Sequence, residues 1–114
     1  MKFERELMKG VAPMITLEVL SRGKMYGYEL STAIEKRSQG IFTLGKGTLY
    51  PLLYNLEAKG LIGSEWECEE GKRNRKFYSI TSKGTKLLTA QKSEWASLRE
   101  GLDLVFGSGN LAFN

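Results

Sequence analysis

Hydrogen-bonding side chains gather on one side of a predicted helix within the segment KGTLYPLLYNLEAKGLI. At about 100° per residue, four positions share one arc of this helix: Tyr50, Pro51, Tyr54 and Asn55. The opposite arc carries Leu49, Leu52, Leu53 and Leu56. Amides and phenols form directed hydrogen bonds with polar partners. The sequence therefore predicts that one side of the helix is core and that the other is displayed for binding.

A second candidate contact is the basic run KRNRK, which follows the acidic stretch EWECEE. It places four cations within five residues: Lys72, Arg73, Arg75 and Lys76. Such a run is commonly a solvated loop, but cations concentrated on one short projection also suit a phosphate contact. This local concentration is more informative than the net charge of +4.

Catalytic and metal chemistry have few candidate residues. The chain has one cysteine, Cys68, and no histidine, so it lacks the commonest general base and the commonest metal ligand. We expect no enzymatic activity, no metal and no cofactor, because no nucleophile–base pair is evident. Cys68 falls in an alternating strand pattern, which favours a small buried hydrophobe over a redox-sensing thiol.

Composition and length suit one folded domain with a modest core. The chain has 114 residues, of which 41% are hydrophobic and 26% charged. No apolar run approaches the roughly 18 to 20 residues that span a bilayer. The N-terminal stretch MKFERELMKG also lacks the continuous apolar region of a secretory signal. A cytoplasmic protein without a membrane partner is the expectation.

Two helices are predicted ahead of the binding segment. The first is expected from near Val11 to Gly23, because Gly10 and Pro13 disturb the earlier part. The second is expected over residues 26–37 and ends in the turn-prone SQG. In the third helix, which holds the binding face, Thr48 is the expected N-cap, Pro51 lies in the first turn and Gly60 ends the helix.

After this helix the apolar period changes from helical to two. Trp66 and Cys68 point one way in SEWECEE, and Tyr78 and Ile80 alternate with their neighbours in RKFYSI. These two strands, joined by EGKRN, predict a hairpin. Thr81 is then the expected N-cap of a last helix that runs to about Phe106.

Three helices followed by a basic-tipped hairpin predict a winged helix-turn-helix, a mainly α fold with a small β-hairpin. The expected divisions are a DNA-binding domain over residues 1–81, a dimerisation helix over 82–106 and a flexible tail over 107–114. In this fold the third helix enters the DNA major groove and the hairpin reaches the backbone or the minor groove beside it. Asn55 can pair with an adenine edge, while Thr48 and Tyr50 can bond phosphates or bases.

The chain resembles PadR-family transcriptional regulators of the short form, which have one C-terminal helix. The resemblance rests on YGYEL at 26–30, GTLYPLLYNLEAKGLI at 47–62 and RKFYSITSKG at 75–84. It departs at Phe77, where the family often has a tyrosine. Together, the residue chemistry and the resemblance predict contacts with double-stranded DNA from Tyr26, Tyr28, Lys46, Thr48, Tyr50, Pro51, Tyr54, Asn55, Lys72, Arg73 and Arg75.

A homodimer is expected from an apolar seam on the last helix, whose spacing is typical of packing against another helix. The predicted interface residues are Leu88, Trp95, Leu98, Leu102 and Val105. The resemblance implies a two-fold dimer in which this helix packs against the first helix of the partner. Such a dimer predicts an inverted-repeat operator.

Two interpretations of Trp95 remain open. It fills the seam between subunits, or it stacks a small aromatic effector in an apolar cavity, as the resemblance to drug-sensing short PadR proteins implies. The effector-binding residues would then be Met8, Val11, Ile15 and Trp95. The expected function is repression by occupying the operator, and the alternative is a winged-helix adaptor that binds another protein through Tyr50 and Tyr54.

Overall fold

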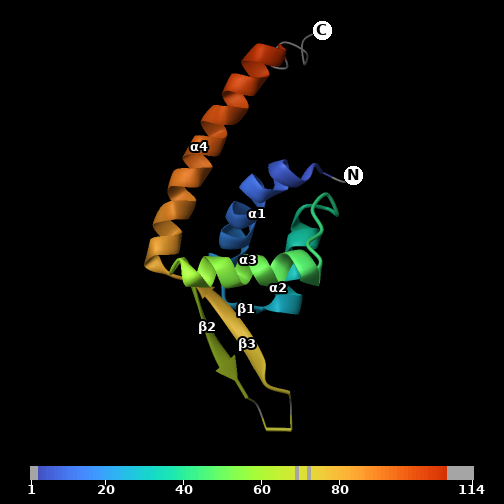
Figure 1. The fold of residues 1–114 in the computed structure, drawn as a ribbon, viewed down its shortest axis with the longest axis vertical. Coiled ribbons are helices and arrows are strands. Elements are labelled where there is room, and N and C mark those ends of the chain that lie inside the picture. The colour runs from blue at the N-terminus through green and yellow to red at the C-terminus, as the bar shows by residue number, and fades with distance from the viewer. Residues whose placement is uncertain (1–2, 69, 72, 108–114) are drawn as a thin grey trace.

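The structure, a computed structural model, describes residues 3–68, 70–71 and 73–107. Its elements, in chain order, are α1 (Arg5–Leu20), β1 (Met25–Tyr26), α2 (Gly27–Arg37), α3 (Lys46–Ala58), β2 (Ile62–Glu67), β3 (Arg75–Ile80) and α4 (Ser82–Phe106). Figure 1 shows the first three helices grouped together, with the β2–β3 hairpin projecting from one end of the group; α4 starts beside α3 near the base of the hairpin and runs past the group, so that its outer part projects in the opposite direction. The predicted tail lies outside the described residues beyond Gly107.

The core forms where α1, α2 and α3 meet the base of the hairpin. Its fully buried side chains are Leu17, Leu20, Leu30, Ile34, Leu49, Leu53 and Ile62. The leucine arc predicted for α3 is confirmed, because Leu49, Leu53 and Leu56 are buried and Leu52 packs against the same cluster. The core therefore fixes which side of α3 remains exposed.

The first helix is longer than its sequence pattern predicts. We expected it to begin near Val11, but α1 begins at Arg5 and contains both Gly10 and Pro13. Tertiary contacts account for the difference, since Met8 packs against the core and the ring of Phe3 lies 5.6 Å from that of Phe42. Such contacts outweigh the weak local preferences of a glycine and a proline.

The start of α3 also differs from the prediction. The helix begins at Lys46 with Gly45 as its N-cap and no capping side-chain bond, so Thr48 lies inside the helix and Pro51 in its second turn. Pro51 cannot donate to the carbonyl of Gly47, four residues earlier. Gly47 is exposed, so that carbonyl lies at the solvent side of the helix and the core is left undisturbed.

At its other end, α3 stops as predicted at Gly60. This residue has a φ of +75°, a conformation that favours glycine. The amide of Gly60 donates to the carbonyl of Glu57 at 2.9 Å, and the amide of Leu61 donates to that of Leu56 at 3.0 Å. The pair forms a Schellman motif, which closes the helix and turns the chain into β2.

The end of α3 is bonded directly to the start of α4. The amide of Thr81 donates to the carbonyl of Leu61 at 3.1 Å, and its hydroxyl donates to that of Gly60 at 2.7 Å. The same hydroxyl accepts the amide of Gly84 at 3.0 Å, which confirms Thr81 as the N-cap of α4. Lys83 adds a bond from its ammonium to the carbonyl of Lys59 at 2.7 Å. We call these residues the α3–α4 junction.

The hairpin belongs to a three-stranded antiparallel sheet with the order β1-β3-β2. The short β1, which the sequence did not indicate, pairs Met25 with Tyr78. Cys68 lies beyond β2 and is exposed, so the prediction of a buried strand cysteine was wrong. Cys68 directly follows the outer end of β2, and Figure 1 shows that this end of the hairpin lies beyond the helices.

The long helix α4 has two parts with different surroundings. Its first turns pack on α1, where Leu88 is buried and Lys92 pairs with Glu18 at 2.7 Å. Its outer part exposes large apolar side chains, namely Trp95, Leu98, Leu102, Leu104, Val105 and Phe106. Among the described residues, no helix is both long and apolar enough to cross a membrane.

The α3–α4 junction leaves no room for a side chain at Gly84. A Cβ atom there would overlap the carbonyl oxygen of Leu61 and lie 2.8 Å from Cγ1 of Ile80. Because the backbone at Leu61 would have to shift, Gly84→Ala is expected to lower the free energy of unfolding by about 2 kcal/mol or more. Urea denaturation at a fixed protein concentration measures this change.

The matched control is Gly10→Ala, at an exposed position within α1 where a Cβ meets no heavy atom within 4 Å. It should raise stability by roughly 0.5 to 1 kcal/mol, because alanine is the better helix former. A Gly84→Ala chain that unfolds at the wild-type urea concentration would contradict the tight junction.

Candidate nucleic-acid interface

The exposed face of α3 presents polar and aromatic side chains in two flanks. Tyr50 and Tyr54 form one flank, beside the start of α2, and Tyr54 is 74% exposed. Thr48 and Asn55 form the other flank and line a groove of about 950 Å³ together with residues of α1 and α4. Pro51 lies between the flanks and is also exposed. The structure thus brings these five predicted contact residues together on one side of α3.

Tyr50 is fixed by its contact with the start of α2. A Cβ atom on Gly27 would lie 2.9 Å from Cζ of Tyr50, so only glycine allows the phenol ring to lie where it does. The ring is 45% exposed, with one side against Gly27 and the rest open to solvent. This packing role explains the glycine of YGYEL, and the sequence alone did not reveal it.

One face of the hairpin is held to the end of α3. Glu57 of α3 accepts a hydrogen bond from the hydroxyl of Ser64, and its Oε1 lies 3.7 Å from Nζ of Lys76. Tyr78, which pairs with Ser64 across the two strands, is buried. Its burial raises the pKa of its phenol, and the negative charge of Glu57 and the neighbouring Tyr50 raise it further. We call Ser64, Trp66, Lys76 and Tyr78 the inner face of the hairpin, because it is the face on the side of α3.

The opposite face is held to the segment before α2. Lys24 pairs with Glu67 and lies 3.8 Å from Oε1 of Glu65. The guanidinium of Arg75 lies 4.5 Å from the ring centre of Tyr26, which in turn meets Phe77 edge-on. Two predicted DNA contacts, Tyr26 and Arg75, are therefore in contact with each other. We call this opposite face the outer face of the hairpin. Its carboxylates Glu65 and Glu67 both pair with Lys24.

The remaining predicted DNA contacts lie around these surfaces. Lys46 is exposed at the start of α3, and Tyr28 is exposed in the first turn of α2. Arg73 is exposed near the tip of the hairpin, while Lys72 lies outside the described residues. Within the described part of the chain, no three acidic or cysteine side chains are grouped as metal ligands.

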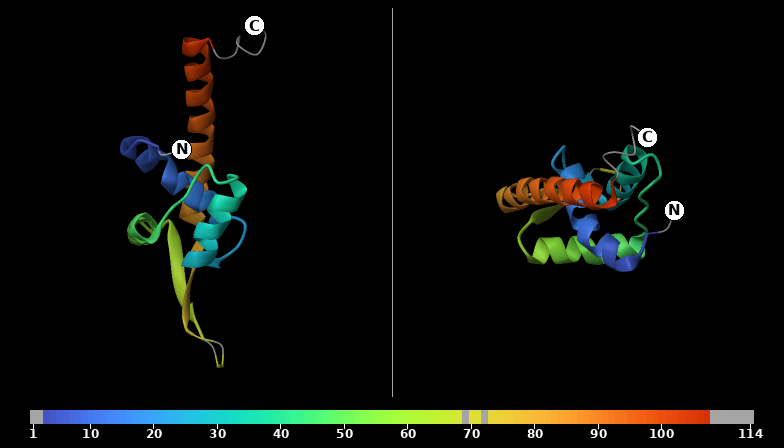
Figure 2. Two further views of the ribbon diagram at one scale, coloured as in Figure 1. Left: turned by 90° about the vertical axis from the view of Figure 1, so that its right-hand side faces the viewer. Right: turned by 90° about the horizontal axis from the view of Figure 1, so that it is seen from above.

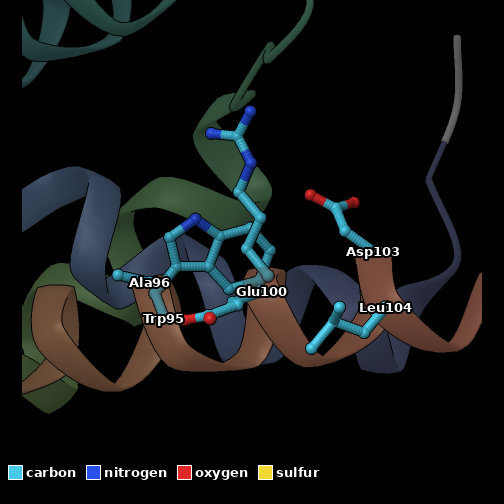
Figure 3. Close-up of a pocket in the computed structure, with 6 residues that line it drawn as sticks. Trp95, Ala96, Glu100, Asp103 and Leu104 are labelled. Atoms are coloured by element: carbon cyan, nitrogen blue, oxygen red, sulfur yellow. The ribbon is translucent and has the colours of Figure 1, made fainter. Parts of the chain in front are cut away.

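The proposed effector and dimer residues are divided between two places. Trp95 lines a surface depression of about 470 Å³ whose other lining residues, from Ala96 to Leu104, also belong to α4. Figure 3 shows their side chains standing on a single helix. Met8 lines the separate groove beside α3, so one chain alone does not bring it to Trp95. Leu88 is buried in its own chain and is not available to a partner.

A three-helix group with a projecting, cation-bearing hairpin defines a winged helix protein, and the fold class predicted from the sequence is confirmed. Residues 16–90 match the model of the transcriptional regulator PadR-like family. The chain belongs to this family, which confirms the resemblance seen in its motifs.

Two solved structures are similar to this chain in fold and in length, and a sequence relative is longer. A transcriptional regulator from Clostridium thermocellum is 31% identical with a TM-score of 0.79, over 86% of this chain and 95% of the other. A PadR family transcriptional regulator from Eggerthella lenta is 33% identical with a TM-score of 0.78, over 89% and 86%. The transcriptional regulator YqjI of Escherichia coli is 31% identical over 80% of this chain but only 42% of its own length.

The buried phenol of Tyr78 predicts a pH dependence of stability. Its pKa is raised in the folded state, so folding is fully favoured below the unfolded value of about 10 and is weakened as the pH rises through the folded value. Removing the phenol with Tyr78→Phe should reduce the stability lost between pH 8 and roughly 10.5, as measured by urea unfolding.

The control for this measurement is Tyr54→Phe, which removes an exposed phenol from α3. Its stability should decline with pH as steeply as that of the wild type. Equal declines in all three proteins would show that Tyr78 is not buried in the way described.

Proposed function

We propose that the protein is a sequence-specific DNA-binding transcriptional regulator that binds an inverted-repeat operator as a homodimer and represses transcription by occupying it. The observation that carries the proposal is the exposed polar face of α3 beside a hairpin whose described tip bears Arg73 and Arg75. Membership of a family of transcriptional regulators supports the same function. Neither this surface nor this family supports an enzymatic function.

The two surfaces have different tasks in this proposal. The face of α3 enters the major groove, where Asn55 pairs with an adenine edge and the rings of Tyr50 and Tyr54 meet thymine methyl groups. Lys46 and Thr48 contact phosphates at the start of the helix. Arg73 and Arg75 neutralise phosphates from the hairpin, a contribution that does not depend on sequence.

Pairing of two chains is supported by the outer part of α4. Leu98, Leu102 and Val105 are exposed together with their apolar neighbours, and a monomer rarely leaves so large an apolar surface uncovered. Covering it with a second copy gives a two-fold dimer, and its recognition helices would lie about 34 Å apart to match one turn of DNA.

A route for release by an effector follows from the α3–α4 junction. The start of α4 is bonded to the carbonyl groups of Lys59 and Gly60, directly after α3, so a change in the angle of α4 would move α3 with it. A flat aromatic molecule that stacks on Trp95 between two subunits would change that angle and the spacing of the recognition helices. Its binding would then weaken the operator complex.

The direct test is fluorescence anisotropy with DNA from upstream of the protein's own gene and a shuffled duplex of equal composition, across a salt series. Asn55→Ala should weaken operator binding by about 1 to 3 kcal/mol and spare the shuffled duplex, because it removes a base contact. Arg73→Ala should instead weaken both and lower the salt slope by about one, because it removes a phosphate contact.

Each variant serves as the control for the other. Equal loss on both duplexes for Asn55→Ala would remove its base-reading role, and an unchanged slope for Arg73→Ala would place the hairpin away from the phosphates. Weak and equal binding of the wild type to every duplex tested, including genomic fragments, would favour a protein-binding adaptor.

The dimer makes a separate prediction about Leu102, which is partly exposed on the apolar side of α4. Leu102→Asp should give monomers in sedimentation, since two carboxylates would be buried without partners at the interface. Ser93→Asp adds the same charge on the opposite side of α4 and should leave the dimer intact. A dimeric Leu102→Asp protein would show that another surface pairs the chains.

A further inference from the structure

We propose that Trp66 packs against the deoxyribose backbone of the DNA strand that lies between α3 and the hairpin, as a contact that positions the protein and reads no base. The proposal rests on the DNA-binding function proposed above and adds to it a contact that the motifs did not indicate. It names one occupant for an indole that the described part of the chain leaves largely exposed.

The starting observation is the exposure of this side chain. Trp66 is 67% exposed, although tryptophan is the largest side chain and one of those most strongly stabilised by burial. It is not part of the core cluster, and it is the second-last residue of β2, whose outer end lies beyond the helices in Figure 1. Its substitution therefore costs the fold little, and its apolar surface is available to a partner.

The register of the sheet places Trp66 on the inner face of the hairpin. Trp66 lies opposite Lys76 in the antiparallel pair, and directly paired residues project from the same face. Ser64, two residues earlier on the same strand, bonds Glu57 of α3. Ser64 and Lys76 both contact Glu57, so this face lies on the side of α3. Trp66 projects from the same face, two residues closer to the tip of the hairpin than Ser64.

The hairpin is also fixed in this orientation. Glu57 holds the inner face, while Lys24 and the ring of Tyr26 hold the outer one. In the side view of Figure 2 (left), α3 lies on one side of the hairpin and the hairpin continues past it. With α3 in a major groove, the backbone next to that groove runs along the inner face.

The chemistry of this face suits a sugar–phosphate chain. The indole offers an apolar ring for the carbons of deoxyribose and an N–H that can donate to a phosphate oxygen. Two carboxylates close to Trp66 are paired, Glu57 with Lys76 and Glu65 with Lys24, while Arg73 is exposed closer to the tip. A protein partner would find the same ring, but it would not need the exposed cation of Arg73 farther along the hairpin.

The test uses Trp66→Ala and Trp66→Phe in the full chain, on the upstream and shuffled duplexes across the salt series. Trp66→Ala should weaken binding by roughly tenfold on both duplexes, because one aromatic contact to a common backbone is lost. The salt slope should remain that of the wild type, because no charge is removed. Trp66→Phe should recover part of the affinity, since it keeps a ring.

A second readout follows the indole itself. Saturating DNA should change the tryptophan emission of the wild-type protein, and this change should be much smaller in Trp66→Phe. The control is Ser79→Ala, an exposed position on the outer face of the same hairpin, which should bind as the wild type does. Circular dichroism checks that each variant is folded, as the exposure of Trp66 predicts.

The outcomes separate this proposal from the one on which it rests. A wild-type protein that binds no duplex would overturn both. Wild-type binding with unchanged affinity for Trp66→Ala, or a DNA-induced emission change that persists in Trp66→Phe, would overturn the Trp66 contact alone. A loss confined to the upstream duplex would also overturn it, because a backbone contact cannot distinguish sequences of equal composition.

Discussion

The structure depends on the bonds that Thr81 and Lys83, at the start of α4, make with carbonyl groups of the chain directly after α3. A helix end leaves carbonyl groups without partners, and here the ammonium of Lys83 bonds that of the C-cap residue Lys59, while the hydroxyl of Thr81 bonds that of Gly60 in the turn that follows. Gly84 allows the closest approach, because any side chain there would overlap Leu61. The exposed face of α3 and the apolar face of α4 are therefore held by one rigid connection, although they lie on different helices. The surface proposed to read DNA and the surface proposed to pair chains cannot move independently near this point.

The same end of α3 also sets the hairpin. Glu57 lies one turn before the junction and binds Ser64 and Lys76 across the inner face, so the helix is tied to the strands on one side and to α4 on the other. Lys24 holds the outer face through its pairing with Glu65 and Glu67, and its pKa is raised by its bond to Glu67. These ion pairs are exposed and individually weak, and they neutralise Lys24 and Lys76, whereas Arg73 is exposed nearer the tip.

Sequence reasoning was accurate where the period of the apolar residues or a single geometric requirement decided the outcome. The leucine arc of α3, Gly60 at its end and Thr81 at the start of α4 follow from helical spacing and capping alone, and each is confirmed. The start of α1, the N-cap of α3 and the exposure of Cys68 depend instead on what lies next to them in space. The ring of Phe42, from a distant loop, contacts Phe3 just before α1, and among the described residues the helices do not extend to the outer end of the hairpin. The contact of Tyr50 with Gly27 joins residues that no local pattern connects.

The length of α4 has a mechanical consequence. Its 25 residues span about 37 Å, so a tilt of about 5° at Thr81 displaces the far end by about 3 Å. In the opposite direction, a shift of that size at the outer end corresponds to a turn of only a few degrees at the junction. The helix is thus a lever with a long outer arm, which converts a displacement into a rotation. In the proposed DNA complex, a second chain or a bound molecule at the outer end would therefore act on the angle of α3, and through that angle on the spacing of the two recognition helices.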